Sequence, residues 1–440
     1  MSNYLCLLMF PAIMLAIFSG FPVAFSLLGV SYLFGAIWFG KGLFPMTIAL
    51  AYKVATNYVL AAVPLFVFMG TLLARTRITD DLYHAAELWV GRFKGGMAIA
   101  VILVCVLFAA CTGIIGSAEI VIGLMALPAM LELKYDKGLA SGVICAGGSL
   151  GTIIPPSVVI IVIGATANVS VGWLLFGAIF PGLLLAGLYI IQVIVRTAMN
   201  PSLAPASPPE KLKMPLQQKV SLTMRSLVPP LALFGAVMGT IMLGLAAPTE
   251  AAATGALGAL VLSAAYKRLS RQVVREAALE CLRISSMIAF IFVGGTLYTA
   301  IFTGLGGREV VETMLVALHL SPYAYVLLSL FVVFLGGFLL DWASLLMIFI
   351  PLFLPFIIEL GFDPVWYCTL FLICIQTSYI TPPMCPAIFY LRSIAPEEVK
   401  TIDMYHGILP FVVAQLIGLA LMVIFPQTVL WLPSKLLLKF

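Results

Sequence analysis

The sequence predicts an all-α polytopic membrane protein with about ten transmembrane helices and two re-entrant hairpins arranged as an inverted repeat. Three observations support this fold class. The 440-residue chain is 63% apolar and only 9% charged, with a mean hydropathy of +1.16, whereas about a quarter of the residues in a soluble domain are charged. Two apolar runs are too long for one membrane crossing and carry small polar residues at their centres. The pattern of the first half recurs in the second half, after one polar segment.

Single spans are expected wherever an apolar run has about 20 residues, the length that crosses a bilayer as a helix. The N-terminal run has no Lys or Arg before it, so we interpret it as the first span and not as a cleaved signal peptide. The expected spans lie near residues 4–19, 21–39, 56–75, 139–167, 172–195, 227–246, 249–266, 284–302, 365–391 and 407–431.

Two apolar runs, 96–131 and 323–360, are nearly twice the length of a single span. The first has Gly116 and Ser117 near its centre, and the second has Asp341. A run that enters the bilayer, turns at a small polar tip and returns to the same side explains both features. We therefore predict two re-entrant hairpins.

Each predicted hairpin is preceded by an amphipathic stretch, at 79–94 and at 307–320. Charged and aromatic residues alternate there at helical spacing, which is typical of helices that lie flat at the membrane surface. A solvated connector is the alternative interpretation of both stretches.

The polar segment 200–226 is rich in Pro, Ser and Lys, and we predict that it is a cytoplasmic linker. It separates a first repeat, 1–199, from a second repeat, 227–440. In each repeat a span interrupted by a Pro-Pro pair follows the hairpin, at 139–167 and at 365–391.

The two halves share a residue frame. Adding 227 to the numbers of Ser117 and Pro155 gives Ser344 and Pro382. Because the first half has five spans, an odd number, and a hairpin that does not cross, the second copy is predicted to be upside down in the membrane.

Charge distribution predicts the orientation. With the linker in the cytoplasm, the cytoplasmic loops hold 18 of the 23 Lys and Arg residues. Cytoplasmic loops of membrane proteins carry such an excess. Both termini are then periplasmic, the first hairpin opens inward and the second opens outward.

The interrupted helices are the candidate binding sites. Lipid cannot satisfy backbone groups freed by a helix break, so such breaks are tolerated where they line a protein cavity or an ion site. Exposed carbonyls and hydroxyls suit a hard cation such as Na⁺, and helix N-termini suit an anion. The Na⁺ candidates are Thr112, Gly113, Gly116, Ser117, Ser149, Gly151, Thr152, Pro155, Ser344, Gln376, Thr377, Ser378, Thr381 and Pro382. The substrate candidates are Ser117, Pro156, Ser157, Asp341, Ser344 and Pro383.

Two carboxylates, Glu119 and Asp341, lie near the two predicted tips and are candidates for charge coupling, by holding a cation or accepting a proton. The alternative is a carboxylate that is wetted by a vestibule or satisfied by a helix N-terminus. For the small residues, the alternative is that Gly and Ser let helices pack closely and Pro only kinks them.

Other functional classes find little support. The eight cysteines form no CxxC pair and the three histidines are scattered, so neither a disulfide framework nor a zinc site is predicted. The net charge of +5 does not require nucleic acid as a partner, because cytoplasmic loops collect basic residues. HExxH and Walker A motifs are absent from the sequence. An intramembrane protease using Asp341 would not explain two matched hairpins, and a channel would need polar residues along every span.

Five segments together resemble the large membrane subunit of the TRAP (tripartite ATP-independent periplasmic) transporters, the DctM-like family, over essentially the whole chain. They are GGSLGTIIPPS (147–157), LFGAIFPGLLLAGLY (175–189), APTEAAATGALGA (247–259), GGFLLDWASLLMIFIPLFLPF (336–356) and IQTSYITPPMCPAIFYLRSIAP (375–396). The first tip departs from a common family form, roughly GSSVAT. It is GSAEIV here, with Glu119 in place of a small residue.

The resemblance implies an elevator-type permease of the bacterial inner membrane, in which a mobile domain carries both hairpins. It implies sodium-driven import of a small organic anion, such as a 2-oxo or hydroxy acid or a sulfonate, without ATP. A periplasmic binding protein would deliver the anion, and a small four-span DctQ-like subunit would join the permease. The family's sodium sites lie at the hairpin tips and adjacent broken spans. A proton-coupled or binding-protein-independent anion transporter is the alternative.

Overall fold

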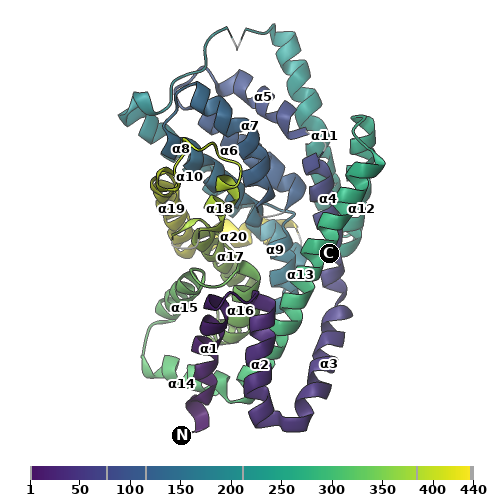
Figure 1. The fold of residues 1–440 in the computed structure, drawn as a ribbon, viewed down its shortest axis with the longest axis vertical. Helices are drawn as coiled ribbons and strands as arrows, with labels where there is room; N and C mark the ends of the chain where they lie inside the picture. The colour runs from purple at the N-terminus through teal and green to yellow at the C-terminus, as the bar shows by residue number, and fades with distance from the viewer. Residues whose placement is uncertain (1, 76–77, 114–115, 211–212, 383–384, 437–440) are drawn as a thin grey trace.

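The computed structural model describes residues 2–75, 78–113, 116–210, 213–382 and 385–436, and all regular elements in these ranges are helices (Figure 1). In the first half they are α1 (Met9–Phe18), α2 (Val23–Phe39), α3 (Leu43–Ala55), α4 (Ala62–Arg75), α5 (Ile78–Val90), α6 (Gly96–Thr112), α7 (Ser117–Glu132), α8 (Lys137–Ser149), α9 (Val158–Ala167) and α10 (Val171–Met199). In the second half they are α11 (Leu216–Met242), α12 (Pro248–Ala265), α13 (Arg271–Gly304), α14 (Gly307–Ala317), α15 (Pro322–Gly336), α16 (Trp342–Glu359), α17 (Pro364–Ile380), α18 (Pro386–Arg392), α19 (Thr401–Ile424) and α20 (Gln427–Leu436).

Short 3₁₀ turns join several of these helices: η1 (Ser2–Leu8), η2 (Gly40–Gly42), η3 (Tyr58–Ala61), η4 (Leu150–Thr152) and η5 (Pro201–Leu203). Within the described ranges, seven helical stretches are long and apolar enough to cross a membrane: Val23–Ala55, Tyr58–Arg75, Val171–Met199, Leu216–Met242, Arg271–Gly304, Trp342–Glu359 and Thr401–Ile424. The predicted fold class, an all-α polytopic membrane protein, is confirmed.

Two groups of helices pack on either side of a shared cavity. The outer group consists of α2, α3, α4, α11, α12 and α13, which pack on one another, with α3, α4, α11 and α12 on the right of Figure 1. The hairpin group consists of α6 to α10 and α15 to α20, with α8, α15 and α19 on the left of the same view. Helix α13 also packs against α16, and α4 packs against α6, so each predicted hairpin touches the outer group.

The first predicted hairpin region contains α6 and α7, which pack against each other and are separated by four residues. Helix α6 ends where Gly113 takes the left-handed conformation, with a φ of +58°, and α7 begins after Gly116, with a φ of +87°. Glycine adopts this conformation at little cost because it has no Cβ. The second region contains α15 and α16, and Asp341 caps the start of α16.

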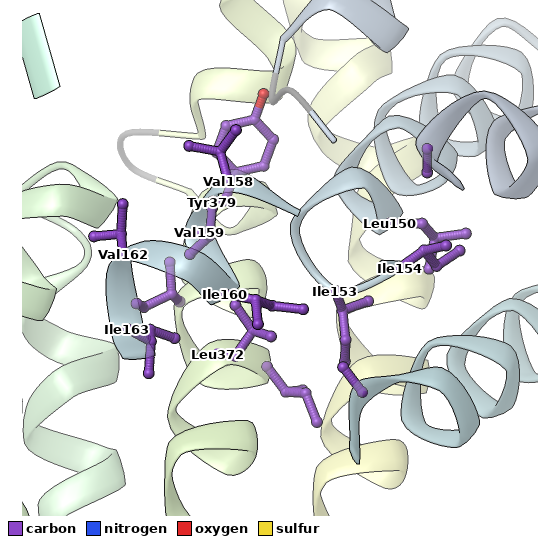
Figure 2. Packing of buried hydrophobic residues seen from close by; sticks show 14 of the residues in the cluster. Leu150, Ile153, Ile154, Val158, Val159, Ile160, Val162, Ile163, Leu372 and Tyr379 are labelled. Carbon is purple, nitrogen blue, oxygen red and sulfur yellow. The ribbon is translucent and has the colours of Figure 1, made fainter. Parts of the chain in front are cut away.

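The helix that follows the first hairpin region is interrupted at Pro155 and Pro156. Helix α8 ends at Ser149, η4 follows, and α9 begins at Val158. Proline cannot donate a backbone hydrogen bond, which favours a helix break. Helix α9 is apolar and buried on all sides from Val158 to Gly164, as the packing in Figure 2 shows, so this break lies inside the protein. In the second half, α17 ends at Ile380 and α18 begins at Pro386.

Two predicted segments have different bounds in the structure, and one helix was not predicted. The expected linker 200–226 is shorter, because α11 already begins at Leu216, in a stretch rich in the helix formers Leu, Gln and Lys. The expected span 407–431 is two helices, α19 and α20, because Pro426 ends the first of them. Helix α3 was not predicted, since its 13 residues are too few to cross a bilayer alone.

Candidate functional site

A cavity of about 830 Å³ lies between the outer group and the hairpin group. Residues near both predicted tips line it, among them Gly113, Ser117 and Asp341. Residues of α2, α4 and α13 line it from the other side. The cavity therefore brings two tips, far apart in sequence, to a single space next to the outer group.

The first tip packs directly on the first helix break. The carbonyl of Gly113 accepts a hydrogen bond from the backbone N–H of Val158, at 3.2 Å. A Cβ added to Gly113 would overlap the carbonyl oxygen of Pro156, so only glycine fits there. The end of α6, the start of α9 and the Pro-Pro segment are consequently held together.

The second half repeats this arrangement. The loop between α15 and α16 packs on α17, since a Cβ added to Gly337 would overlap the Ser378 side chain. At the start of α16, Asp341 accepts a hydrogen bond from the N–H of Ala343 at 3.1 Å and another from the Ser344 hydroxyl. The Asp341 carboxylate therefore fixes the end of the helix that faces the cavity.

Most of the hydroxyl groups predicted to bind Na⁺ donate a hydrogen bond to a nearby backbone carbonyl. Thr112, Ser149 and Thr152 are fully buried, and each donates its hydroxyl to a backbone carbonyl of its own helix or turn, at 2.7–2.9 Å. Ser157, Thr377, Ser378 and Thr381 do the same at 2.5–2.9 Å. A hydroxyl oxygen that donates one bond keeps lone pairs free, so these oxygens can accept from a donor or bind a cation.

The two halves meet at Ser149 and Gln376. The Gln376 amide Nε2 donates to the Ser149 hydroxyl at 3.1 Å, and both side chains are fully buried. These two residues correspond under the offset of 227. Residues related by a two-fold axis touch each other only if they lie at that axis, so the contact supports the predicted repeat.

Glu119 lies at the start of α7 and is fully buried. Its Oε1 accepts a hydrogen bond from the Tyr379 hydroxyl at 3.0 Å, whereas its Oε2 has no hydrogen-bond partner among the residues that the structure describes. Close packing surrounds it, since a Cβ added to Gly148 would overlap the carboxylate. The positive end of α7 stabilises a negative charge at this position. Glu119 thus joins the first tip to α17, beside the residues that line the cavity.

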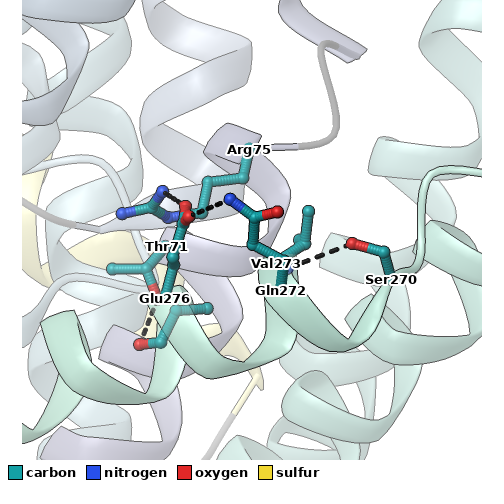
Figure 3. A network of polar contacts seen from close by, with 7 residues as sticks. Thr71, Arg75, Ser270, Gln272, Val273 and Glu276 are labelled. Carbon is teal, nitrogen blue, oxygen red and sulfur yellow. Dashed lines mark hydrogen bonds and ion pairs between the residues drawn. The ribbon is translucent and has the colours of Figure 1, made fainter.

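Charged residues of the outer group also line the cavity. Arg75, at the end of α4, forms an ion pair with Glu276 of α13, and Glu276 also accepts a hydrogen bond from Gln272 at 2.9 Å (Figure 3). Glu280 and Arg283, further along α13, line the cavity as well. The positive charge of Arg75 is largely compensated by its carboxylate partner.

The structure separates the predicted site residues into two sets. The cavity is lined by Gly113, Gly116, Ser117, Asp341 and Ser378. The others do not line the cavity and are buried or half-buried: Thr112, Ser149, Gly151, Thr152, Pro155, Pro156, Ser157, Ser344, Gln376, Thr377, Thr381 and Pro382. Pro383 lies outside the described residues.

Sequence reasoning missed the outer wall of the cavity. Arg75, Glu280 and Arg283 contribute charge to it, and Tyr379 and Tyr390 contribute rings to the hairpin side. The residues of the outer wall lie in continuous helices, so no helix break in the sequence indicates them. Their place at the cavity results from the packing of α4 and α13 against the hairpin group.

Residues 10–428 match the family model of the tripartite ATP-independent periplasmic transporter, DctM component. The chain belongs to this family. It is therefore a transporter permease and not an enzyme, and it is a multi-pass membrane protein of a tripartite, ATP-independent system.

Curated relatives of this DctM-family chain carry different substrate names. The C4-dicarboxylate TRAP transporter large permease protein DctM of Pseudomonas aeruginosa is 28% identical, with 87% of this chain and 88% of that protein covered. The sialic acid TRAP transporter large permease protein SiaM of Vibrio cholerae is 29% identical, with 95% and 96% covered. The isethionate TRAP transporter permease protein DctMQ of Oleidesulfovibrio alaskensis is 25% identical, with 87% and 60% covered.

Two solved transporters share the fold of this DctM-family chain. The YdaH transporter of Alcanivorax borkumensis superposes with a TM-score of 0.63 at 17% identity, covering 94% of this chain and 98% of that one. MtrF of Neisseria gonorrhoeae gives a TM-score of 0.61 at 13% identity, covering 88% and 85%. At these sequence identities, the structural similarity supports a shared fold but not a shared function.

Proposed function

We propose that the chain is the permease subunit of a sodium-coupled, binding-protein-dependent importer of a small organic anion, a carboxylate such as a 2-oxo or hydroxy acid or a sulfonate. The observation that carries this proposal is the cavity onto which both tips face. An ion and an anion bound there would contact both halves of the protein at once. The names of the relatives support an anionic substrate, because C4-dicarboxylates, sialic acid and isethionate are all organic anions.

The residues around the tips suit Na⁺ in their chemistry. Hard cations prefer oxygen ligands, and the buried hydroxyls of Thr112, Thr152 and Thr377 offer oxygen lone pairs without a net charge. Ser117 is the first residue of α7 and Ser344 lies in the first turn of α16, at positions that correspond under the offset of 227. We infer that the oxygens of the tips and breaks hold Na⁺, and that the substrate candidates bind the anion beside it.

Transport would proceed by movement of the hairpin group past the outer group, with both termini in the periplasm. The two groups meet along α13 and α16 and along α4 and α6, with the cavity between them. A binding protein would deliver the anion, and a four-span DctQ-like subunit would join the outer group. Isethionate DctMQ is much longer than this chain, which leaves room in that relative for a second membrane component.

The ion gradient supplies enough energy for this mechanism. Moving one net charge through 100 mV yields about 2.3 kcal/mol, and a tenfold gradient of one ion yields about 1.4 kcal/mol. Two Na⁺ entering with one monoanion would thus provide about 5 kcal/mol, which supports accumulation by roughly several thousandfold at full coupling.

Uptake into proteoliposomes tests the proposed function. The permease is reconstituted with its four-span subunit, and purified binding protein is added outside with labelled succinate, pyruvate or isethionate. We expect uptake of one of these anions with an inward Na⁺ gradient and not with choline in place of Na⁺. Uptake that is independent of Na⁺ would contradict the coupling, and uptake driven by a proton gradient would favour the proton-coupled alternative.

Replacing the tip serines is expected to weaken the response to sodium. Ser117→Ala or Ser344→Ala removes one candidate ligand oxygen, at a cost of about 1 kcal/mol, or about a fivefold rise in the Na⁺ concentration for half-maximal uptake. Ser263→Ala is the matched control, because Ser263 is also a buried helical serine and lies in α12, away from the cavity. Unchanged sodium titration curves in both tip variants would count against the assigned sites.

A further inference from the structure

Arg283 differs from the other arginine on the outer wall of the cavity. Arg75 is engaged by Glu276, and this carboxylate is held in turn by Gln272 (Figure 3). Arg283 lies two helical turns beyond Glu276 along α13, is exposed, and makes no ion pair or side-chain hydrogen bond within the described part of the chain. Its guanidinium therefore has no ion-pair partner among the described residues, although the Glu280 carboxylate, one turn earlier on α13, lines the same cavity.

The surroundings of Arg283 indicate that its guanidinium is available to a ligand in the cavity and does not bind another segment of the described chain. Its neighbours on the cavity face of α13 are Ile284, Met287 and Ile291, which leave the guanidinium as the polar group of that face, together with Glu280. Ser117 and Trp342, the first residues of α7 and α16, line the same cavity. The N-termini of these two helices thus border the same space as Arg283, with the Asp341 carboxylate capping that of α16.

We propose that Arg283 is an anion-contact residue of the outer group, which binds the carboxylate or sulfonate of the substrate while the hairpin group holds the rest of the molecule. A guanidinium is suited to this role, because its planar donors can bind two oxygens of a carboxylate or sulfonate at once. The inference rests on the proposed function for the identity of the cavity as the transport route. It adds a contact from the stationary side, which none of the tip residues provides.

The position of Arg283 also indicates when it acts. It lies at the end of the outer group where α4 ends and α13 begins, and this end is cytoplasmic in the predicted orientation. On its way into the cell, the anion would meet Arg283 before the tips release it. The guanidinium would then lower the energy of the anion inside the cavity and draw it away from the tips.

Cysteine modification rates test the proposal without knowledge of the substrate. Met287→Cys places a thiol one turn from Arg283 on the same cavity face, at a side chain that is 49% exposed. The probes are the anionic 2-sulfonatoethyl methanethiosulfonate, itself an alkyl sulfonate, and its cationic trimethylammonium counterpart, with the reaction of the parent chain subtracted. The measured quantity is the ratio of the anionic to the cationic reaction rate.

We expect Arg283→Gln in the Met287→Cys background to lower this ratio by about fivefold, since loss of one nearby charge changes the local potential by on the order of kT. Arg283→Lys keeps the positive charge and should therefore leave the ratio of anionic to cationic reaction rates close to the parent value. This variant also controls for an effect of the substitution on folding. Arg275→Gln, an exposed arginine on the same helix but away from the cavity, should leave it unchanged. A ratio that stays within twofold of the parent value in Arg283→Gln would overturn the proposal. Failure of sodium-driven uptake in the unmodified chain would overturn only the proposed function.

Discussion

The Gly407→Ala variant is expected to lose about 4 kcal/mol or more of folding stability, because two helix backbones touch at this glycine. Helices α8 and α19 pack closely, and a Cβ added to Gly407 would overlap the backbone carbonyl of Gly138. A Cβ added to Gly142 would in turn overlap the carbonyl of Gly407. Backbone atoms cannot move aside as a flexible side chain can, so the two helices would have to separate and lose packing around the first break.

Thermal unfolding of the purified variant, followed by fluorescence-detected size exclusion, measures this effect. Gly187→Ala is the matched control, since Gly187 lies inside α10 and a Cβ there would meet nothing within 4 Å. That variant should be as stable as the parent chain or up to about 1 kcal/mol more stable. An unchanged melting temperature in Gly407→Ala would show that α8 and α19 are further apart than described.

The Asp341→Ala variant is expected to reduce sodium-driven uptake on the order of thirtyfold, through loss of the cap that positions the second tip. Removal of the carboxylate takes the acceptor from the Ala343 N–H and from the Ser344 hydroxyl. The two losses together cost about 2 kcal/mol in the population of the ordered tip. The measurement is the initial rate of uptake into proteoliposomes.

A second capping aspartate separates this local effect from a general loss of stability. Asp363 caps α17 by accepting from the N–H groups of Val365 and Trp366, at 2.7 and 3.2 Å, and it is not among the cavity residues. Asp363→Ala should lower the melting temperature by a similar amount and keep most of the uptake. Equal loss of uptake in both variants would contradict a specific role of the second tip. Asp341→Asn, which keeps an acceptor oxygen, shows whether the charge itself is needed.

The features that could be predicted from sequence are those with a local cause. Proline lacks the N–H that continues a helix, so the interruption between α8 and α9 and the end of α19 follow from Pro155 and Pro426, although only the first was recognised as a break. The small residues around Gly113 marked the first tip, and the membrane class followed from composition alone. The DctM-like motifs correctly predicted the family.

The remaining features depend on contacts between distant segments. The contact between Ser149 and Gln376 joins the two halves, although the two side chains have little in common in sequence. Arg283 became a candidate only when α13 was seen to line the cavity. Helix α3 and the first turns of α11 were missed because apolar length was the criterion, and both owe their order to packing on neighbouring helices.

A pair of cryo-EM maps of the reconstituted permease, one in sodium and one in choline, tests most directly whether the paired tips and breaks form an ion site. The account predicts interrupted helices at Pro155 and Pro382 in both maps. It also predicts sodium-dependent density coordinated by oxygens at the tips around Ser117 and Ser344. Continuous helices through either proline, or sodium-dependent density only outside the cavity between the outer group and the hairpin group, would contradict it.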